Sequence, residues 1–128
     1  MTNNKWQSAG STSGSDAEQQ ALVWLTRQGL SLIERNYLCK TGEIDLIMRE
    51  GHTIVFVEVR FRRINHYGGS LESVDRRKQQ KLLRAANHFL LCRRQFSNMP
   101  CRFDVLAGSP DSSPQQSIVW SWIKNAFC

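Results

Sequence analysis

Two consecutive apolar segments, each with an acidic residue in its interior, constrain the fold of this chain most. Residues 43–49 read EIDLIMR and residues 53–61 read TIVFVEVRF, and only a short connection separates them. Both segments are nearly continuously apolar apart from their charged members, which is typical of strands that are covered on both faces. We therefore predict a hairpin at the centre of a sheet that is flanked by helices.

Helices and shorter strands are predicted on both sides of this hairpin. Apolar residues recur at helical spacing in two further segments, and Gly29 ends the first of them. We predict helices over 16–28 and 74–95, and strands over 30–37, 101–107 and 118–124. Residues 1–15 are rich in Ser, Thr, Asn and Gly, which predicts a flexible tail. Residues 16–128 then form a single α/β domain.

Positive charge is concentrated in one segment of the chain. The formal net charge is +6, and residues 60–94 carry ten basic side chains against two acidic ones. A basic surface of this kind attracts the phosphates of nucleic acids, although a solvated helix face that serves only solubility is the alternative. The residues predicted to contact nucleic acid are Arg62, Arg63, Arg77, Lys78, Lys81 and Arg84.

The turn of the hairpin decides which acidic side chains face each other. With Gly51–His52 as a two-residue loop, Asp45 lies opposite Glu58. With Glu50–Gly51 as the loop, Glu43 lies opposite Glu58 instead. In both registers an acidic cluster lies inside the sheet.

Facing carboxylates in a sheet repel each other and need a compensating cation. A divalent metal is one such cation, because Asp45 and Glu58 offer the oxygen ligands that Mg²⁺ or Mn²⁺ binds, with waters and substrate phosphate completing its shell. Arg60 is the other, because it lies two residues after Glu58 on the same face and would form a purely structural pair with Asp45.

Glu18 is a third candidate acid. It begins the stripe of the first predicted helix that continues through Ala21, Leu22 and Leu25, so it points toward the core. The alternative is a capping box with Ser15, in which Glu18 has no role at a metal.

These residues together resemble the PD-(D/E)xK nuclease signature, and more closely the bacterial YraN-like family, a Holliday junction resolvase-like branch of the restriction-endonuclease-like fold. The resemblance extends from Glu18 over nearly the whole chain. The matching residues are Glu18, Gly42–Ile47, Val55–Arg60, Tyr67–Gly68, Val74, Lys78, Arg102–Val105 and Trp122–Phe127.

The resemblance implies a mixed β-sheet core flanked by helices, a metal site at Asp45 and Glu58 assisted by Glu18, and catalysis on DNA phosphodiesters, with branched DNA as one expected substrate. It also implies a homodimer. Arg60 departs from the signature, which has lysine there; arginine can hold a phosphate oxygen but cannot act as a general base. The alternative function is a non-catalytic nucleic-acid-binding module with the same fold.

Two remaining features concern the cellular environment. The longest apolar runs are too short to span a bilayer and the first ten residues contain no apolar signal segment, which predicts a cytoplasmic protein. The four cysteines form no C-x-x-C pair, and we expect reduced thiols that lie mostly in the core.

Overall fold

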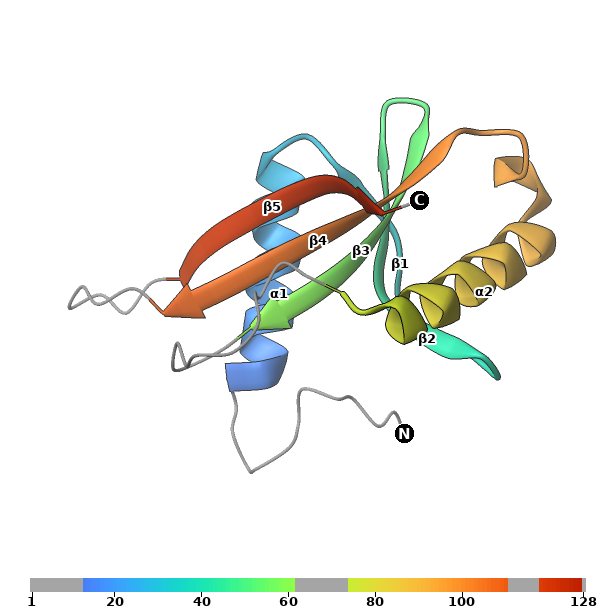
Figure 1. Ribbon diagram of the computed structural model, residues 1–128. Helices are drawn as coiled ribbons and strands as arrows, with labels where there is room; N and C mark the ends of the chain where they lie inside the picture. The colour runs from blue at the N-terminus through green and yellow to red at the C-terminus, as the bar shows by residue number, and fades with distance from the viewer. Residues whose placement is uncertain (1–12, 62–73, 111–117, 128) are drawn as a thin grey trace.

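The structure, a computed structural model, describes residues 13–61, 74–110 and 118–127. A five-stranded sheet lies between two helices in this part of the chain (Figure 1). The elements are α1 (Ser13–Arg27), β1 (Ser31–Cys39), β2 (Gly42–Glu50), β3 (Thr53–Phe61), α2 (Arg76–Cys92), a short 3₁₀ turn (Arg94–Phe96), β4 (Cys101–Pro110) and β5 (Ile118–Phe127). This confirms the predicted mixed sheet flanked by helices, and every predicted helix and strand is present.

The order of the strands in the sheet is β1-β2-β3-β4-β5. All neighbours are antiparallel except β3 and β4, which are parallel. A parallel pair needs a crossover connection, and α2 lies in that connection. The predicted hairpin therefore supplies the central strand of the sheet and one of its neighbours.

The register of the β2–β3 hairpin confirms the Gly51–His52 loop. Glu50 pairs with Thr53 and Leu46 pairs with Val57. Gly51 has a φ of +62°, which lies in the left-handed region that the first position of a type II′ turn requires. The alternative register, in which Glu43 opposes Glu58, is wrong.

Each face of the sheet has its own apolar core, and the two helices lie on different sides (Figure 1). Side chains of β3 alternate between the faces: Ile54 and Phe56 pack with α2, whereas Val55 and Val57 pack with α1. The buried residues of α2 are Leu82, Ala85, Ala86 and Phe89, as its predicted stripe requires. We call these two sides the α2 face and the α1 face.

The ends of α1 show how local sequence sets the helix. Gly29 adopts a φ of +105°, and the N–H groups of Gly29 and Leu30 donate to the carbonyls of Thr26 and Leu25. These two bonds form a Schellman motif, which closes the helix and turns the chain into β1. At the other end, α1 begins at Ser13, three residues before the predicted start.

Some predictions fall outside the described residues, and one is wrong. Residues 1–12, most of the predicted tail, and residues 62–73, which contain Arg62 and Arg63, lie outside the described ranges. Cys39 is half-buried and Cys92 and Cys101 are exposed, so the expectation that the thiols lie mostly in the core is wrong for these three.

Neither helix in the described ranges combines the length and apolarity needed to cross a membrane.

Candidate functional site

Asp45 lies where the regular alternation of β2 breaks. Ile44 packs on the α2 face and Leu46 on the α1 face, although residues two apart in a regular strand share a face. Pairing of β2 with β3 reaches Leu46 and Val57 and is not continued to Asp45. Instead, the buried Asp45 carboxylate accepts a hydrogen bond of 2.8 Å from the backbone N–H of Val59. A side chain thus takes a position that a strand carbonyl would occupy.

Glu58 directly precedes Val59 in β3, so the N–H that Asp45 binds belongs to the next residue along the strand. The Glu58 side chain is only 4% exposed, and strand alternation places it on the α2 face with Phe56. Glu58 Oε2 lies 3.6 Å from Lys78 Nζ of α2. The structure therefore pairs Glu58 with a lysine from a different element, 20 residues further along the chain.

The first turn of α2 fixes the backbone of Lys78. Asp75 is the N-cap of α2, and its Oδ1 accepts a hydrogen bond of 2.8 Å from Lys78 N. The Gln79 side chain donates to the carbonyl of Val74, which tightens the same turn. The ammonium of Lys78 thus starts from an anchored backbone position next to the sheet.

Glu18 faces the sheet from α1. The helix begins at Ser13, so Ser15 lies within it and not at the N-cap position that the capping-box alternative assumed. Glu18 is almost completely buried, and its Oε1 lies 3.3 Å from Arg35 Nη2 on β1. Arg35 also donates to the side chain of Gln19. No local sequence pattern indicates Arg35, because it lies 17 residues away from Glu18 in the chain.

The donor set for a divalent cation is small. Within residues 13–61, 74–110 and 118–127, no group of three or more His, Cys, Asp or Glu side chains lies close enough to hold a metal ion. Asp45 and Glu58 are a pair of hard oxygen donors, and Mg²⁺ commonly uses one or two carboxylates and completes its shell with water and phosphate. Two carboxylates are the number of protein ligands that a substrate-completed Mg²⁺ site uses, and they are too few for a closed protein cage.

Arg60 of β3 and Lys78 of α2 are the basic residues that the chain order and the ion pair place nearest Glu58. Arg60 is half-buried and follows Glu58 by two residues, so alternation places it on the same face. Of the predicted nucleic-acid-binding residues that the structure describes, Arg77, Lys81 and Arg84 are exposed on α2. They form a solvent-accessible row of positive charge along the helix that also carries Lys78.

A fourth buried acid, Asp104 of β4, is held by a different set of partners. Arg102 donates to both of its oxygens at 3.0–3.2 Å, and the indole of Trp122 donates at 2.9 Å. Asn125 N adds a bond of 2.8 Å at an irregular point of β5, where its φ is +53°. Burial lowers the pKa of Arg102, but hydrogen bonds to Asp104 and Glu50 outweigh it and raise that pKa overall. This cluster is saturated with donors and joins β4 to β5.

Two thiols differ in their electrostatic surroundings. Burial raises the pKa of the Cys39 thiol, but hydrogen bonds with Thr41 and the backbone of Gly42 outweigh burial, so the net pKa lies below its usual value. Burial raises the pKa of Cys101. On β1, burial also raises the pKa of the Tyr37 hydroxyl, which hydrogen-bonds His88 Nδ1 of α2.

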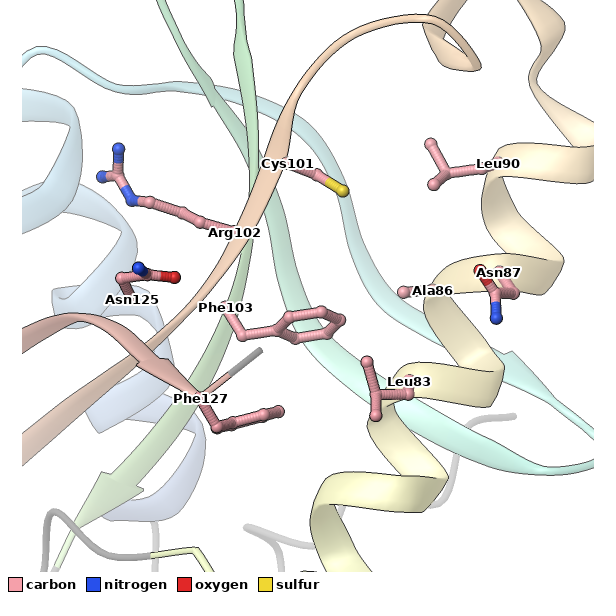
Figure 2. Close-up of a pocket in the computed structure, with 9 residues that line it drawn as sticks. All are labelled: Leu83, Ala86, Asn87, Leu90, Cys101, Arg102, Phe103, Asn125 and Phe127. Atoms are coloured by element: carbon pink, nitrogen blue, oxygen red, sulfur yellow. The ribbon is translucent and has the colours of Figure 1, made fainter.

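A pocket of about 270 Å³ lies between α2 and the β4–β5 edge of the sheet (Figure 2). Phe103 and Phe127 point toward α2, and Leu83 lies opposite them. Its walls are mostly apolar, and none of the predicted site residues in the described ranges is among its lining residues. The pocket is therefore distinct from the position of Asp45 and Glu58.

Comparison with known proteins shows which family the chain resembles. Residues 17–107 match the family described as "Uncharacterised protein family UPF0102". A UPF0102 protein from Alcanivorax borkumensis is 54% identical over 114 residues, which are 89% of this chain and 90% of that protein. A UPF0102 protein from Stutzerimonas stutzeri is 51% identical over 120 residues, 94% of this chain and 98% of that protein. These matches confirm the YraN-like family that the sequence motifs predicted.

Proposed function

The chain belongs to the family UPF0102, and we propose that it is a metal-dependent nuclease that hydrolyses phosphodiester bonds of DNA. The observation that carries the proposal is the burial of Asp45 and Glu58 on the neighbouring strands β2 and β3. Asp45 accepts a hydrogen bond from the N–H of Val59, and the buried Glu58 is the residue before it. Burying two carboxylates opposes folding, and a functional role at a cation accounts for their retention.

The irregular backbone of β2 supports the same conclusion. On β1, Asn36 lies between Arg35 and Tyr37, whose partners on β2 flank Asp45, and Asn36 has a φ of +54°. Sparsely populated backbone conformations persist where the surrounding structure enforces them, and they cluster at functional sites. The irregular backbone on β1 thus lies opposite the strand position whose carboxylate bonds β3.

In the proposed mechanism, Asp45 and Glu58 hold one Mg²⁺ or Mn²⁺ ion. Such an ion supplies an activated water and offsets negative charge on the leaving oxygen. Arg60 holds a non-bridging oxygen of the scissile phosphate through its planar guanidinium. Glu18, predicted to orient the water or a second ion, remains a proposed participant whose described partner is Arg35.

The basic residues of α2 supply the affinity for the polymer. Lys78, Lys81 and Arg84, together with Arg77, neutralise successive phosphates and release counterions. Arg62 and Arg63 are proposed to extend this contact. From the family resemblance we further propose branched DNA as the preferred substrate, a homodimer as the active form, and the cytoplasm as its location.

Cleavage assays test the nuclease proposal. Linear, flapped and four-way DNA are incubated with the protein and Mg²⁺ or Mn²⁺, and Asp45→Asn is compared with the unaltered chain. The proposal expects metal-dependent cleavage that Asp45→Asn reduces by at least about a hundredfold. Cleavage that is unchanged by Asp45→Asn would remove the mechanism.

A non-catalytic nucleic-acid-binding protein is the second candidate. The presence of Arg60 where the nuclease signature has lysine favours it, because arginine cannot serve as a general base. Calorimetry distinguishes the two functions. Salt-sensitive DNA binding without binding of Mg²⁺ or Mn²⁺, in the presence of DNA, would establish the binding module and exclude the nuclease.

A further inference from the structure

We infer that Lys78 is a positioning residue for Glu58: its ammonium holds the carboxylate in the absence of a metal ion and is displaced when a divalent cation binds. This inference rests on the proposed nuclease function. It gives Lys78 a role in addition to the phosphate contact predicted from the charge of α2, because the Lys78 ammonium lies within ion-pair distance of Glu58.

The need for such a cation follows from the burial of Glu58. Its side chain is 4% exposed and lies on a face lined by Phe56 and Val105. An ionised carboxylate in such surroundings requires a compensating charge. Lys78 supplies one from α2, and the Asp75 N-cap anchors the backbone from which it extends.

The geometry of the Lys78–Glu58 pair indicates that a metal ion can displace the Lys78 ammonium. The distance of 3.6 Å between Lys78 Nζ and Glu58 Oε2 exceeds the 2.7–2.9 Å that is usual for a charge-assisted hydrogen bond. The Lys78 side chain is 34% exposed, whereas Glu58 is buried. The ammonium can therefore swing into solvent while the carboxylate stays in place.

The chemistry of lysine suits this exchange better than that of arginine. Lysine carries a compact charge on a flexible stem and makes point contacts with phosphate, whereas arginine forms planar, two-pronged pairs that are harder to release. Once displaced from Glu58, the Lys78 ammonium lies beside the proposed metal position. There it is available to the phosphate that enters with the metal.

The first test measures binding of Mn²⁺ alone by calorimetry, without DNA. Lys78→Gln removes a positive charge that competes with the metal, so we expect Mn²⁺ to bind about fivefold more tightly. Lys78→Arg keeps the charge in a pair that is harder to release, so it is expected to bind Mn²⁺ no more tightly than the unaltered chain does. Lys81→Gln is the matched control, because Lys81 is an exposed lysine three residues further along α2.

The outcomes separate this inference from the proposed function. If the unaltered chain binds Mn²⁺ but Lys78→Gln leaves the affinity unchanged or weaker, the inferred displacement of Lys78 is wrong, whereas the proposed metal site is retained. If the unaltered chain and Asp45→Asn both fail to bind Mn²⁺, the metal-dependent function fails and the exchange fails with it. A purely structural pair would lower stability in Lys78→Gln without tightening metal binding.

A second measurement needs no variant that might unfold. The side-chain resonances of ¹³C-labelled lysine are followed in the unaltered protein while Mg²⁺ is added, with Lys78→Arg used only for assignment. Exchange predicts that the Lys78 resonance moves in step with metal saturation and that the Lys81 resonance does not. A Lys78 resonance that stays fixed at saturating Mg²⁺ would overturn the inference.

Discussion

The carboxylate of Asp45 accepts a hydrogen bond from the backbone N–H of Val59 at 2.8 Å. The bond joins β2 to β3 beyond the last regular pair of the hairpin, Leu46 with Val57. It fixes one oxygen of Asp45 and holds the carboxyl group next to the residue that follows Glu58. This relationship gives Asp45 a structural role in addition to its proposed role at a metal ion, and substitutions can separate the two.

We predict that Asp45→Asn and Asp45→Ala differ in stability but not in activity. Asparagine keeps a carbonyl oxygen for the N–H of Val59, whereas alanine leaves that buried donor without an acceptor. The free energy of unfolding, measured with denaturant, should therefore be about 2 kcal/mol lower for the alanine variant than for the asparagine variant. Both variants should lose cleavage. Equal stabilities would show that the Val59 bond contributes little.

The exposed basic residues of α2 should determine the salt dependence of DNA binding. Each phosphate contact contributes about 0.9 to the slope of log affinity against log salt concentration for duplex DNA. Lys81→Gln and Arg84→Gln should each lower the slope by about that amount, as measured by fluorescence anisotropy. Lys124→Gln is the charge-matched control, because Lys124 lies over the Trp122 ring on β5. An equal effect of the control would indicate that net charge alone drives binding.

Gly108 of β4 leaves room for the ring of Trp120 on the neighbouring strand. A Cβ atom at position 108 would lie 2.5 Å from Trp120 Cζ3 and 2.9 Å from Ile118 Cγ2, both too close for contact. We predict that Gly108→Ala lowers the free energy of unfolding by about 1–3 kcal/mol. A double-mutant cycle with Trp120→Leu should recover part of this loss. If Trp120→Leu recovers none of the lost stability, contact with the Trp120 ring is not the cause of the loss in Gly108→Ala.

The two thiols with shifted pKa values should react at different pH. The thiolate is the reactive form, so a thiol with a lowered pKa reaches its full alkylation rate at lower pH. Iodoacetamide labelling followed by mass spectrometry should therefore give a lower pH midpoint for Cys39 than for Cys101, whose pKa is raised by burial. The midpoint does not depend on how accessible each thiol is. The reverse order would contradict the hydrogen bonding of Cys39 with Thr41.

Sequence reasoning predicted the features that depend on local patterns. The apolar character of two segments placed the hairpin at the centre of the sheet, and the glycine at position 51 limited its loop to two registers, of which the structure has Gly51–His52. Helical spacing identified the buried stripe of α2, including Leu82 and Phe89. These features depend on residues close together in the chain, so they can be predicted from short-range periodicity.

Partners that come from distant elements were not predictable in the same way. Lys78 was assigned to nucleic-acid contact by its charge, but the packing of α2 on the sheet brings it to Glu58. Arg35 reaches Glu18 only because α1 packs next to β1. The break in alternation at Asp45 was also missed, because a regular strand period was assumed across position 45. Each of these features depends on tertiary packing rather than on local spacing.

The central claim is that Asp45 and Glu58 share one divalent cation, and a crystal soaked in Mn²⁺ tests it most directly. We predict an anomalous-difference peak about 2.1 Å from an oxygen of each carboxylate, with the Lys78 ammonium moved away from Glu58. Asp45→Asn crystals treated in the same way should lack the peak. A Mn²⁺-saturated crystal with no peak between Asp45 and Glu58, and with the Lys78–Glu58 pair intact, would contradict the account.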